Sequence, residues 1–198
     1  MIPYARQDID DADIAAVVDR IEIHTERLLL RELGESDVSD AYLAWLNDPL
    51  VNQYLETRFS EQTLERIRAF VLEKSRSDVE FLFGIFHAGR HIGNIKLGPI
   101  HRRHRLADVS YLIGARDMWG RGVASEAIRA VSLEGFRRFG LNKLSAGVYA
   151  PNIASARALE KAGYQCEGVR LDHYFLGEES VDLFDYGLRR VDVTVTDV

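Results

Sequence analysis

A glycine-rich turn between a strand-like stretch and a helix-like stretch constrains the fold of this chain most. Residues 111–128 read YLIGARDMWGRGVASEAI. Because Gly120 and Gly122 have no side chains, the backbone around them can approach a diphosphate closely. A helix that begins here adds its unpaired amides and the positive end of its dipole. We therefore predict an anion cradle formed by these glycines and by the amides of Arg121, Val123 and Ala124.

Two other phosphate-binding loops do not fit these letters. The sequence contains no GxxxxGKS or GxxxxGKT segment, and no GxGxxG with an acidic residue about twenty positions further on. The spacing therefore argues against a nucleoside triphosphate loop and against a dinucleotide loop.

The segment WGRGVA closely resembles the pyrophosphate loop of the GNAT acyltransferases. That loop has Gln or Arg, then Gly three positions later and Gly or Ala two positions after that. Gly122 and Ala124 match the last two positions, whereas Trp119 replaces the Gln or Arg. A WGxG loop followed by EA is typical of the RimJ/RimL-like branch of that family. The resemblance implies that Trp119 and its neighbours bind CoA.

A second segment supports the first. NIASARALEKAGY, from Asn152 to Tyr164, resembles the NxxSxxxxxKxGF segment that lies along the pantetheine arm in the same family. The resemblance implies that Asn152 and Ser155 contact the cofactor. For Asn152 the alternative is a helix N-cap alone, and for Ser155 it is a bond to the helix backbone.

Composition and charge argue against several other classes of function. The chain has 198 residues, a formal charge of −6, one cysteine and six scattered histidines. We expect a single cytoplasmic domain over residues 21–198, without membrane spans, nucleic-acid binding or a bound metal. We expect a monomer or a homodimer. The basic run HRRHR at 101–105 is either a solvated loop or a contact for an acidic or phosphate-bearing acceptor.

The order of elements predicts an α/β (α+β) fold. Hydrophobic periodicity indicates a strand in 21–33, a helix after Ser36 that Pro49 closes, and a helix capped by Ser60. Three antiparallel strands over 79–114, a helix over 122–139, a strand, a helix over 152–162 and a final hairpin follow. This order, βααβββαβαββ, is that of GNAT enzymes. It implies a mixed sheet of six to seven strands with helices on both faces.

The first twenty residues lie outside that resemblance. IPYARQDIDDADIAAVV resembles the opening of DegT/DnrJ-type sugar aminotransferases, but the likeness ends before any residue that could bind pyridoxal phosphate. We therefore expect an N-terminal arm over residues 1–20 and no pyridoxal phosphate. The alternative is an acidic amphipathic arm with no such relationship.

The resemblance also implies candidates for the chemistry. Backbone N–H groups of Leu112, Ile113 and Gly114 occupy the stretch that binds the thioester oxygen in GNAT enzymes. Asp108 stands where similar histone acetyltransferases place a general base, and a water relay would compensate for its short side chain. The alternatives are a solvated Asp108, with His101 or His104 as base.

The usual general acid of the family is absent. Leu159 occupies the position of the tyrosine that protonates the departing thiol in many GNAT enzymes. Ser155 is the nearest hydroxyl that could hydrogen bond the sulfur, so Asp108 and Ser155 are the candidate catalytic residues.

Together these features predict an enzyme that transfers an acetyl group from acetyl-CoA to a primary amine by direct attack in a ternary complex. The favoured acceptor is a nucleotide-linked amino sugar, because of GNIKLGPI at 93–100, the basic loop and the aminotransferase-like opening. The first alternative is a protein N-terminus, as for the enzymes that name the branch. The second is a CoA-binding module without catalysis.

Overall fold

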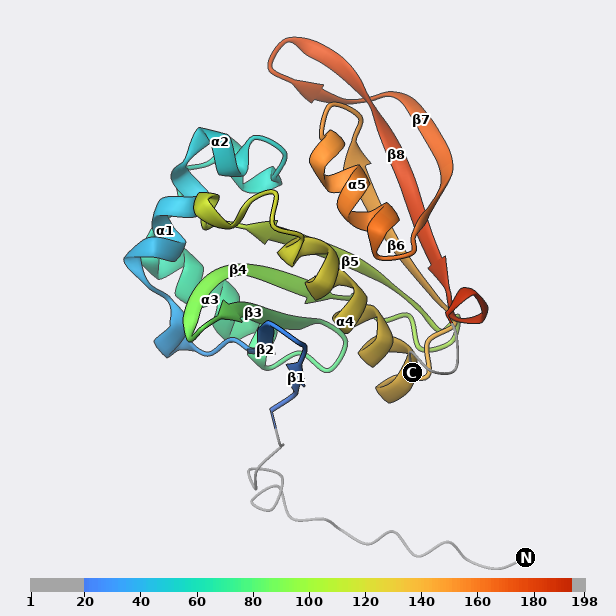
Figure 1. Ribbon diagram of the computed structural model, residues 1–198. Coiled ribbons are helices and arrows are strands. Elements are labelled where there is room, and N and C mark those ends of the chain that lie inside the picture. The colour runs from blue at the N-terminus through green and yellow to red at the C-terminus, as the bar shows by residue number, and fades with distance from the viewer. Residues whose placement is uncertain (1–19, 194–198) are drawn as a thin grey trace, which may run out of the picture.

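The computed structural model describes residues 20–193 (Figure 1). The aminotransferase-like opening therefore lies outside the described residues. Within the described part, no helix is both long and apolar enough to cross a membrane.

One mixed sheet organises the molecule. Its strands follow the order β1-β2-β3-β4-β5-β6-β8-β7. All neighbours are antiparallel except β5 and β6, which are parallel. The strands are β1 (Glu22–His24), β2 (Leu28–Glu32), β3 (Phe81–His87), β4 (Arg90–Leu97), β5 (Leu106–Ile113), β6 (Lys143–Tyr149), β7 (Gln165–Leu176) and β8 (Glu179–Arg189).

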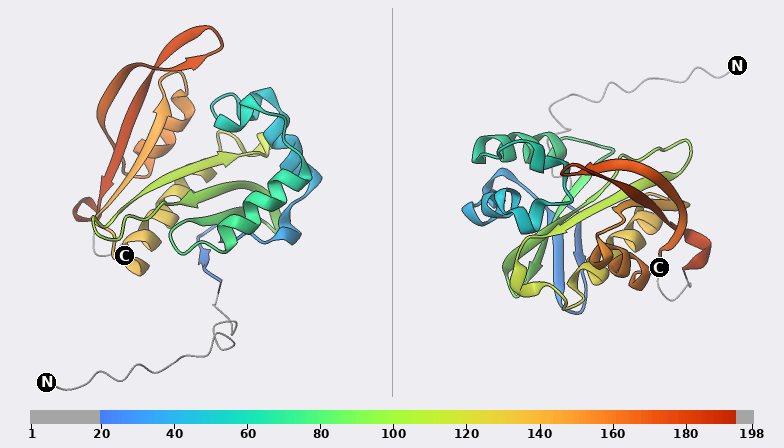
Figure 2. Two further views of the ribbon diagram at one scale, coloured as in Figure 1. Left: turned by 180° about the vertical axis from the view of Figure 1, so that it is seen from behind. Right: turned by 90° about the horizontal axis from the view of Figure 1, so that it is seen from above.

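Helices cover both faces of the sheet, as expected (Figure 2). On one face α4 packs against the main core, to which Ile128 and Val131 belong together with Phe83 and Ile85. On the other face α1 and α3 enclose a smaller core that includes Leu82. The helices are α1 (Asp40–Asn47), α2 (Pro49–Asn52), α3 (Leu64–Ser75), α4 (Val123–Arg138) and α5 (Ile153–Lys161).

The first strand of the sequence prediction is two strands, so the sheet has eight rather than six or seven. A tight turn divides it, because the N–H of Thr25 donates to the Leu28 carbonyl and the N–H of Leu28 donates to the Thr25 hydroxyl. Short turns of this kind leave little trace in hydrophobic periodicity.

Local capping also corrects the first two helix starts. Helix α1 begins after Ser39, whose hydroxyl accepts from the Tyr42 N–H, and not after Ser36. Helix α3 begins after Thr63, whose hydroxyl accepts from the Arg66 N–H, and not after Ser60. Pro49 opens the short α2 rather than closing α1, which suits a residue with fixed φ and no N–H.

The second half of the chain matches the predicted order. Helix α4 follows Gly122, helix α5 follows Asn152, and Gly177 turns the β7–β8 hairpin. The GNAT order of elements is therefore confirmed, with the extra division at Thr25.

Candidate active site

Two parallel strands separate at the centre of the sheet. Strand β5 pairs with β6 only from Leu106 to Asp108, opposite Lys143 to Ser145. Beyond this point the strands diverge, as the left view of Figure 2 shows. A cavity of about 720 Å³ opens between them. Its walls come from β5, β6, the segment before α4, the start of α5 and the region after α1.

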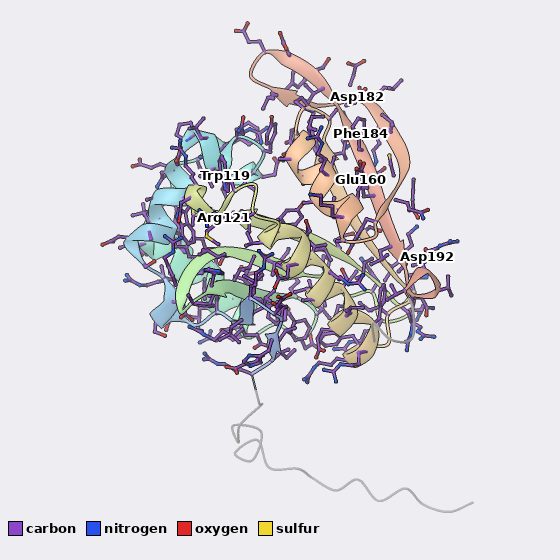
Figure 3. All side chains as sticks on the ribbon, in the orientation of Figure 1. Trp119, Arg121, Glu160, Asp182, Phe184 and Asp192 are labelled. Carbon is purple, nitrogen blue, oxygen red and sulfur yellow. The ribbon has the colours of Figure 1, made fainter. Side chains whose placement is uncertain are left out.

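The glycine loop lies at one end of this cavity. Gly120 and Gly122 have φ angles of 71° and 76°, in the left-handed region that favours glycine. A Cβ added at Gly120 would meet no atom within 4 Å, so space outside the loop is open there. Trp119 and Arg121 lie on this segment (Figure 3), and the Trp119 indole N–H donates to the Ile113 carbonyl at 2.7 Å. This bond ties the loop to β5.

A second tie holds the loop from the other side. Arg27, in the β1–β2 turn, donates from Nε to Glu126 Oε2 at 2.7 Å and from Nη1 to the Arg121 carbonyl at 3.0 Å. Thr25 donates its hydroxyl to the other oxygen of Glu126. Burial acts to raise the pKa of Glu126, but these hydrogen bonds outweigh it and hold the pKa below its usual value. Glu126 is therefore a carboxylate at neutral pH.

Sequence reasoning missed this clamp. Arg27 and Glu126 stand 99 positions apart, and neither residue belongs to the predicted glycine loop. The EA dipeptide after the loop was the one available signal, since Glu126 lies in the first turn of α4.

The N–H groups of the three residues expected at the thioester oxygen point to different sides of β5. The Gly114 N–H donates to the Ile92 carbonyl at 2.9 Å, so it is already engaged. Leu112 pairs with Asn94 of β4 in the same register, and alternation directs its N–H to β4. Ile113 lies between them, so its N–H points toward the side of β6. A Cβ on Gly114 would overlap the Trp45 ring, so close packing also requires this glycine.

The start of α5 forms the opposite wall. The Asn152 side chain accepts from the Ser155 N–H at 3.2 Å and so caps α5. The Ser155 hydroxyl lies 2.7 Å from the Tyr111 hydroxyl, which also lies 3.1 Å from the Ser155 carbonyl. Burial raises the pKa of Tyr111 to about 12, so its hydroxyl keeps its proton. Leu159 is fully buried on the same wall.

Asp108 lies at the last position where β5 and β6 pair, just before the cavity opens. Along β5 the lining of the cavity begins with Val109 and Ser110, so it does not include Asp108. Desolvation raises the pKa of Asp108, and the nearby charges of His101 and Lys96 act in the opposite direction.

The basic loop lies at the other end of β5. Arg102 pairs with Asp78, and Arg105 donates to the Gly140 carbonyl at 2.8 Å, so the loop braces neighbouring turns. His101 and His104 are exposed there and do not line the cavity. The segment 93–100 contributes mainly to the core, through Ile95 and Leu97.

Two side-chain groups of the cavity region were not among the predicted site residues. Arg157 and Lys161 on α5 line the cavity and give its α5 wall a positive charge. Tyr54 and Tyr149 line the cavity beside the turn Glu56–Phe59. A lone tyrosine gives no sequence signal, because most aromatic residues at such positions belong to the core. Among the described residues, no three His, Cys, Asp or Glu side chains cluster as a metal site.

Comparison with known proteins decides the family. The model for the acetyltransferase (GNAT) domain matches residues 27–165, which include the clamp, the glycine loop and α5. The chain belongs to the GNAT acetyltransferase family. In sequence this GNAT protein is 30% identical over 169 residues to the uncharacterized N-acetyltransferase YoaA of Bacillus subtilis, covering 84% of the chain and 95% of that relative.

Solved GNAT structures share the fold. A spermidine N-acetyltransferase from Vibrio cholerae, in complex with CoA and spermine, superposes with a TM-score of 0.75 at 21% identity, covering 85% of this chain and 98% of that one. The Salmonella typhimurium acetyl transferase that modifies the N-terminal serine of ribosomal protein L7/L12 superposes with a TM-score of 0.75 at 20% identity. The superposition covers 85% of this chain and 99% of that one.

As a GNAT enzyme, the protein is an acyltransferase that uses acetyl-CoA. The residues present fit this cosubstrate. The open space at Gly120, the first amides of α4 and the cations on α5 suit a diphosphate and its arm.

Proposed function

We propose that this enzyme is a RimJ/RimL-like N-acetyltransferase that passes the acetyl group directly from acetyl-CoA to a primary amine in a ternary complex. The observation that carries the proposal is the separation of β5 from β6 beside the glycine loop. It leaves an open strand edge where a thioester can lie, with an anion cradle at one end. The tryptophan in the loop supports the branch.

Donor binding follows from the loop and from α5. The backbone N–H groups of Arg121, Val123 and Ala124 hold the diphosphate, and Gly120 and Gly122 allow its close approach. Arg157 and Lys161 add positive charge. The Asn152 side chain, which caps α5 through its oxygen, has amide hydrogens left to donate to the pantetheine arm.

The transfer needs a polarised carbonyl and a leaving thiolate. The Ile113 N–H stabilises the oxygen as the amine attacks the carbonyl carbon, a C–N bond forms and the C–S bond breaks. The Ser155 hydroxyl donates to the departing sulfur, with Tyr111 able to donate to Ser155 in turn. A base must also remove a proton from the amine. Asp108 is one candidate, acting through water from beside the cavity.

The acceptor is the finer question. A nucleotide-linked amino sugar stays our favoured acceptor, supported by the tyrosines beside the cavity, since aromatic rings stack on sugars and bases. The basic loop and the segment 93–100 no longer support it, because both lie away from the cavity. A protein N-terminus is the alternative, in line with the similarity to the Salmonella enzyme. The Vibrio enzyme adds polyamines to the acceptors worth testing.

Thiol release from acetyl-CoA, measured with a panel of amines, tests this proposal. The panel comprises nucleotide-linked amino sugars, peptides with free N-termini and polyamines. We expect release that depends on one of these classes and a labelled acetyl group on its nitrogen. CoA binding without release for any amine would instead support a binding module, and release confined to peptides would exclude the sugar.

A further inference from the structure

Tyr149 ends β6 on the wall of the cavity that faces β5. Asp108 lies opposite Ser145 where the parallel strands still pair, and four residues further along the two strands are Leu112 and Tyr149. Tyr149 is 7% exposed and lines the cavity. Its ring therefore lines the same cavity as the stretch of β5 whose Ile113 amide is proposed to hold the thioester carbonyl.

The hydroxyl of Tyr149 connects this wall to a carboxylate outside it. It donates to Glu56 Oε1 at 2.6 Å, and Arg58 Nη2 donates to the same hydroxyl at 3.2 Å. The side chain of Glu56 is 67% exposed, whereas that of Arg58 is 13% exposed. A buried hydroxyl is thus linked by one short hydrogen bond to a group that reaches solvent.

Arg58 fixes this arrangement. Its guanidinium also donates to the carbonyls of Leu55 and Phe175, which joins the turn after α2 to the β7–β8 hairpin. Tyr174 of the hairpin stacks on the Tyr149 ring, with centroids 4.9 Å apart. The Tyr149 ring is therefore held by stacking, and its hydroxyl has a direction fixed by Arg58 and Glu56.

The described wall of the cavity carries no carboxylate and no imidazole. None of its described lining residues is Asp, Glu or His. Asp108 lies just outside the wall, where β5 and β6 are still paired. From the lining, the Tyr149 hydroxyl leads directly to a carboxylate. Desolvation and the charge of Glu56 raise the pKa of Tyr149, against the effect of Arg58, so the phenol stays protonated at neutral pH.

We propose that Tyr149 is a catalytic residue that receives the proton of the acceptor ammonium while passing its own proton to Glu56. The proposal rests on the proposed acetyltransferase function. One N–H bond of the ammonium breaks, a new O–H bond forms on Tyr149, and the former Tyr149 proton moves to Glu56. The neutral amine then attacks the thioester. Glu56 acts through Tyr149 and is a positioning residue, and solvent takes its proton after the transfer.

The test compares pH profiles of kcat/KM for the amine that the parent enzyme acetylates. We expect Tyr149→Phe and Glu56→Gln each to lower kcat/KM about a hundredfold near neutral pH, the low end of general acid–base contributions. The loss should shrink as pH rises, because the amine then loses its proton unaided. Tyr186→Phe is the matched control, because the Tyr186 hydroxyl donates to Glu160 at 3.0 Å outside the cavity lining, and it should match the parent at every pH. KM for acetyl-CoA should stay unchanged in all three.

Several results would overturn the proposal. A loss that is equal at every pH would assign a structural role, and parent-like rates would assign none. A loss that depends on pH in Asp108→Asn but not in Tyr149→Phe would make Asp108 the base. Failure of the proposed function is separate, since the parent would then release no thiol with any amine.

A second measurement needs no turnover. Nuclear magnetic resonance of tyrosine labelled at Cζ identifies Tyr149 as the signal lost in Tyr149→Phe. We expect this signal to titrate at higher pH in the parent than in Glu56→Gln, because that variant removes the neighbouring negative charge. Equal titration in both proteins would break the link between Tyr149 and Glu56 and overturn the relay.

Discussion

Arg27 and Glu126 join the β1–β2 turn to the first turn of α4 through a hydrogen bond of 2.7 Å. The same guanidinium holds the Arg121 carbonyl at 3.0 Å, in the middle of the glycine loop. Arg27 thereby fixes the position of the Arg121 carbonyl and of the first turn of α4 relative to the sheet. The anion cradle is thus shaped by a residue far from it in the sequence.

Arg27→Ala should weaken CoA binding about tenfold. A hydrogen bond to a charged group contributes about 1.5 kcal/mol, and about 1.4 kcal/mol corresponds to tenfold in affinity. Calorimetric titration with CoA measures the effect. Arg170→Ala is the matched control, because Arg170 makes a similarly exposed ion pair with Asp185 on the distant hairpin. Equal affinity in Arg27→Ala and the parent would show that the loop holds its shape without the clamp.

Gly122→Asp should abolish CoA binding. The new side chain would stand at the start of α4 and repel a diphosphate, in addition to a strain of about 1 kcal/mol at positive φ. Gly177→Asp carries the same strain in the hairpin turn, where φ is 68° and no atom lies within 4 Å of a Cβ. It should lose stability and keep CoA binding. Thermal unfolding of both variants measures the strain, and titration of the folded variants with CoA measures the repulsion. Retained CoA binding in Gly122→Asp would refute the anion cradle.

Ser155→Ala should lower kcat about tenfold and leave KM for acetyl-CoA unchanged, because a thiol leaves readily and the general acid then contributes less than its usual hundredfold or more. The Tyr111 hydroxyl keeps the backbone carbonyl of residue 155 as a partner, so the wall should persist. Ser132→Ala is the control. It breaks a similar pair, in which Ser132 meets the Tyr164 hydroxyl at 2.9 Å away from the cavity lining. Steady-state kinetics of the two variants should differ, and equal kcat values would remove Ser155 from the chemistry.

His91 should make the fold less stable in acid. Burial lowers the pKa of His91, against the Asn94 hydrogen bond and the charge of Asp37, while Arg31 adds to the lowering. In the unfolded chain His91 takes up a proton near about pH 6.5, whereas in the folded protein it does so only at lower pH. The free energy of unfolding therefore falls as pH drops below about 6.5. Urea unfolding between about pH 5 and pH 8, a range that spans the ordinary histidine pKa, would measure this fall in the free energy of unfolding.

The control for this prediction is a pair of variants. In His91→Gln the stability should fall less steeply with acid than in the parent, because the titrating group is gone. His104→Gln changes an exposed residue and should follow the parent. Parallel curves for all three proteins would contradict the prediction.

Local sequence signals predicted the helix starts correctly in the second half of the chain, but they gave the wrong starts for α1 and α3. Gly122 and Asn152 mark helix starts because each supplies what its own turn requires, a positive φ or a side-chain cap. Ser36 and Ser60 look equally good as caps. The caps observed are Ser39 and Thr63, because the packing of α1 and α3 on the sheet selects one start among several close ones.

The candidate site divides in the same manner. Gly120, Gly122 and Asn152 were identifiable because a loop and a cap depend on consecutive residues. Tyr149 and Glu56 meet through elements 93 positions apart, and neither has a neighbour in the sequence that signals the contact.

By itself the sequence determined the order of elements, the glycine loop and the resemblance to GNAT enzymes, because these depend on periodicity and on short segments. Only the tertiary structure decided which amide of β5 faces the cavity and how Arg27 holds the loop. It alone showed that Tyr149 leads from the cavity to Glu56. Such contacts depend on strand register and on where β5 and β6 separate, and those arise when distant segments pack together.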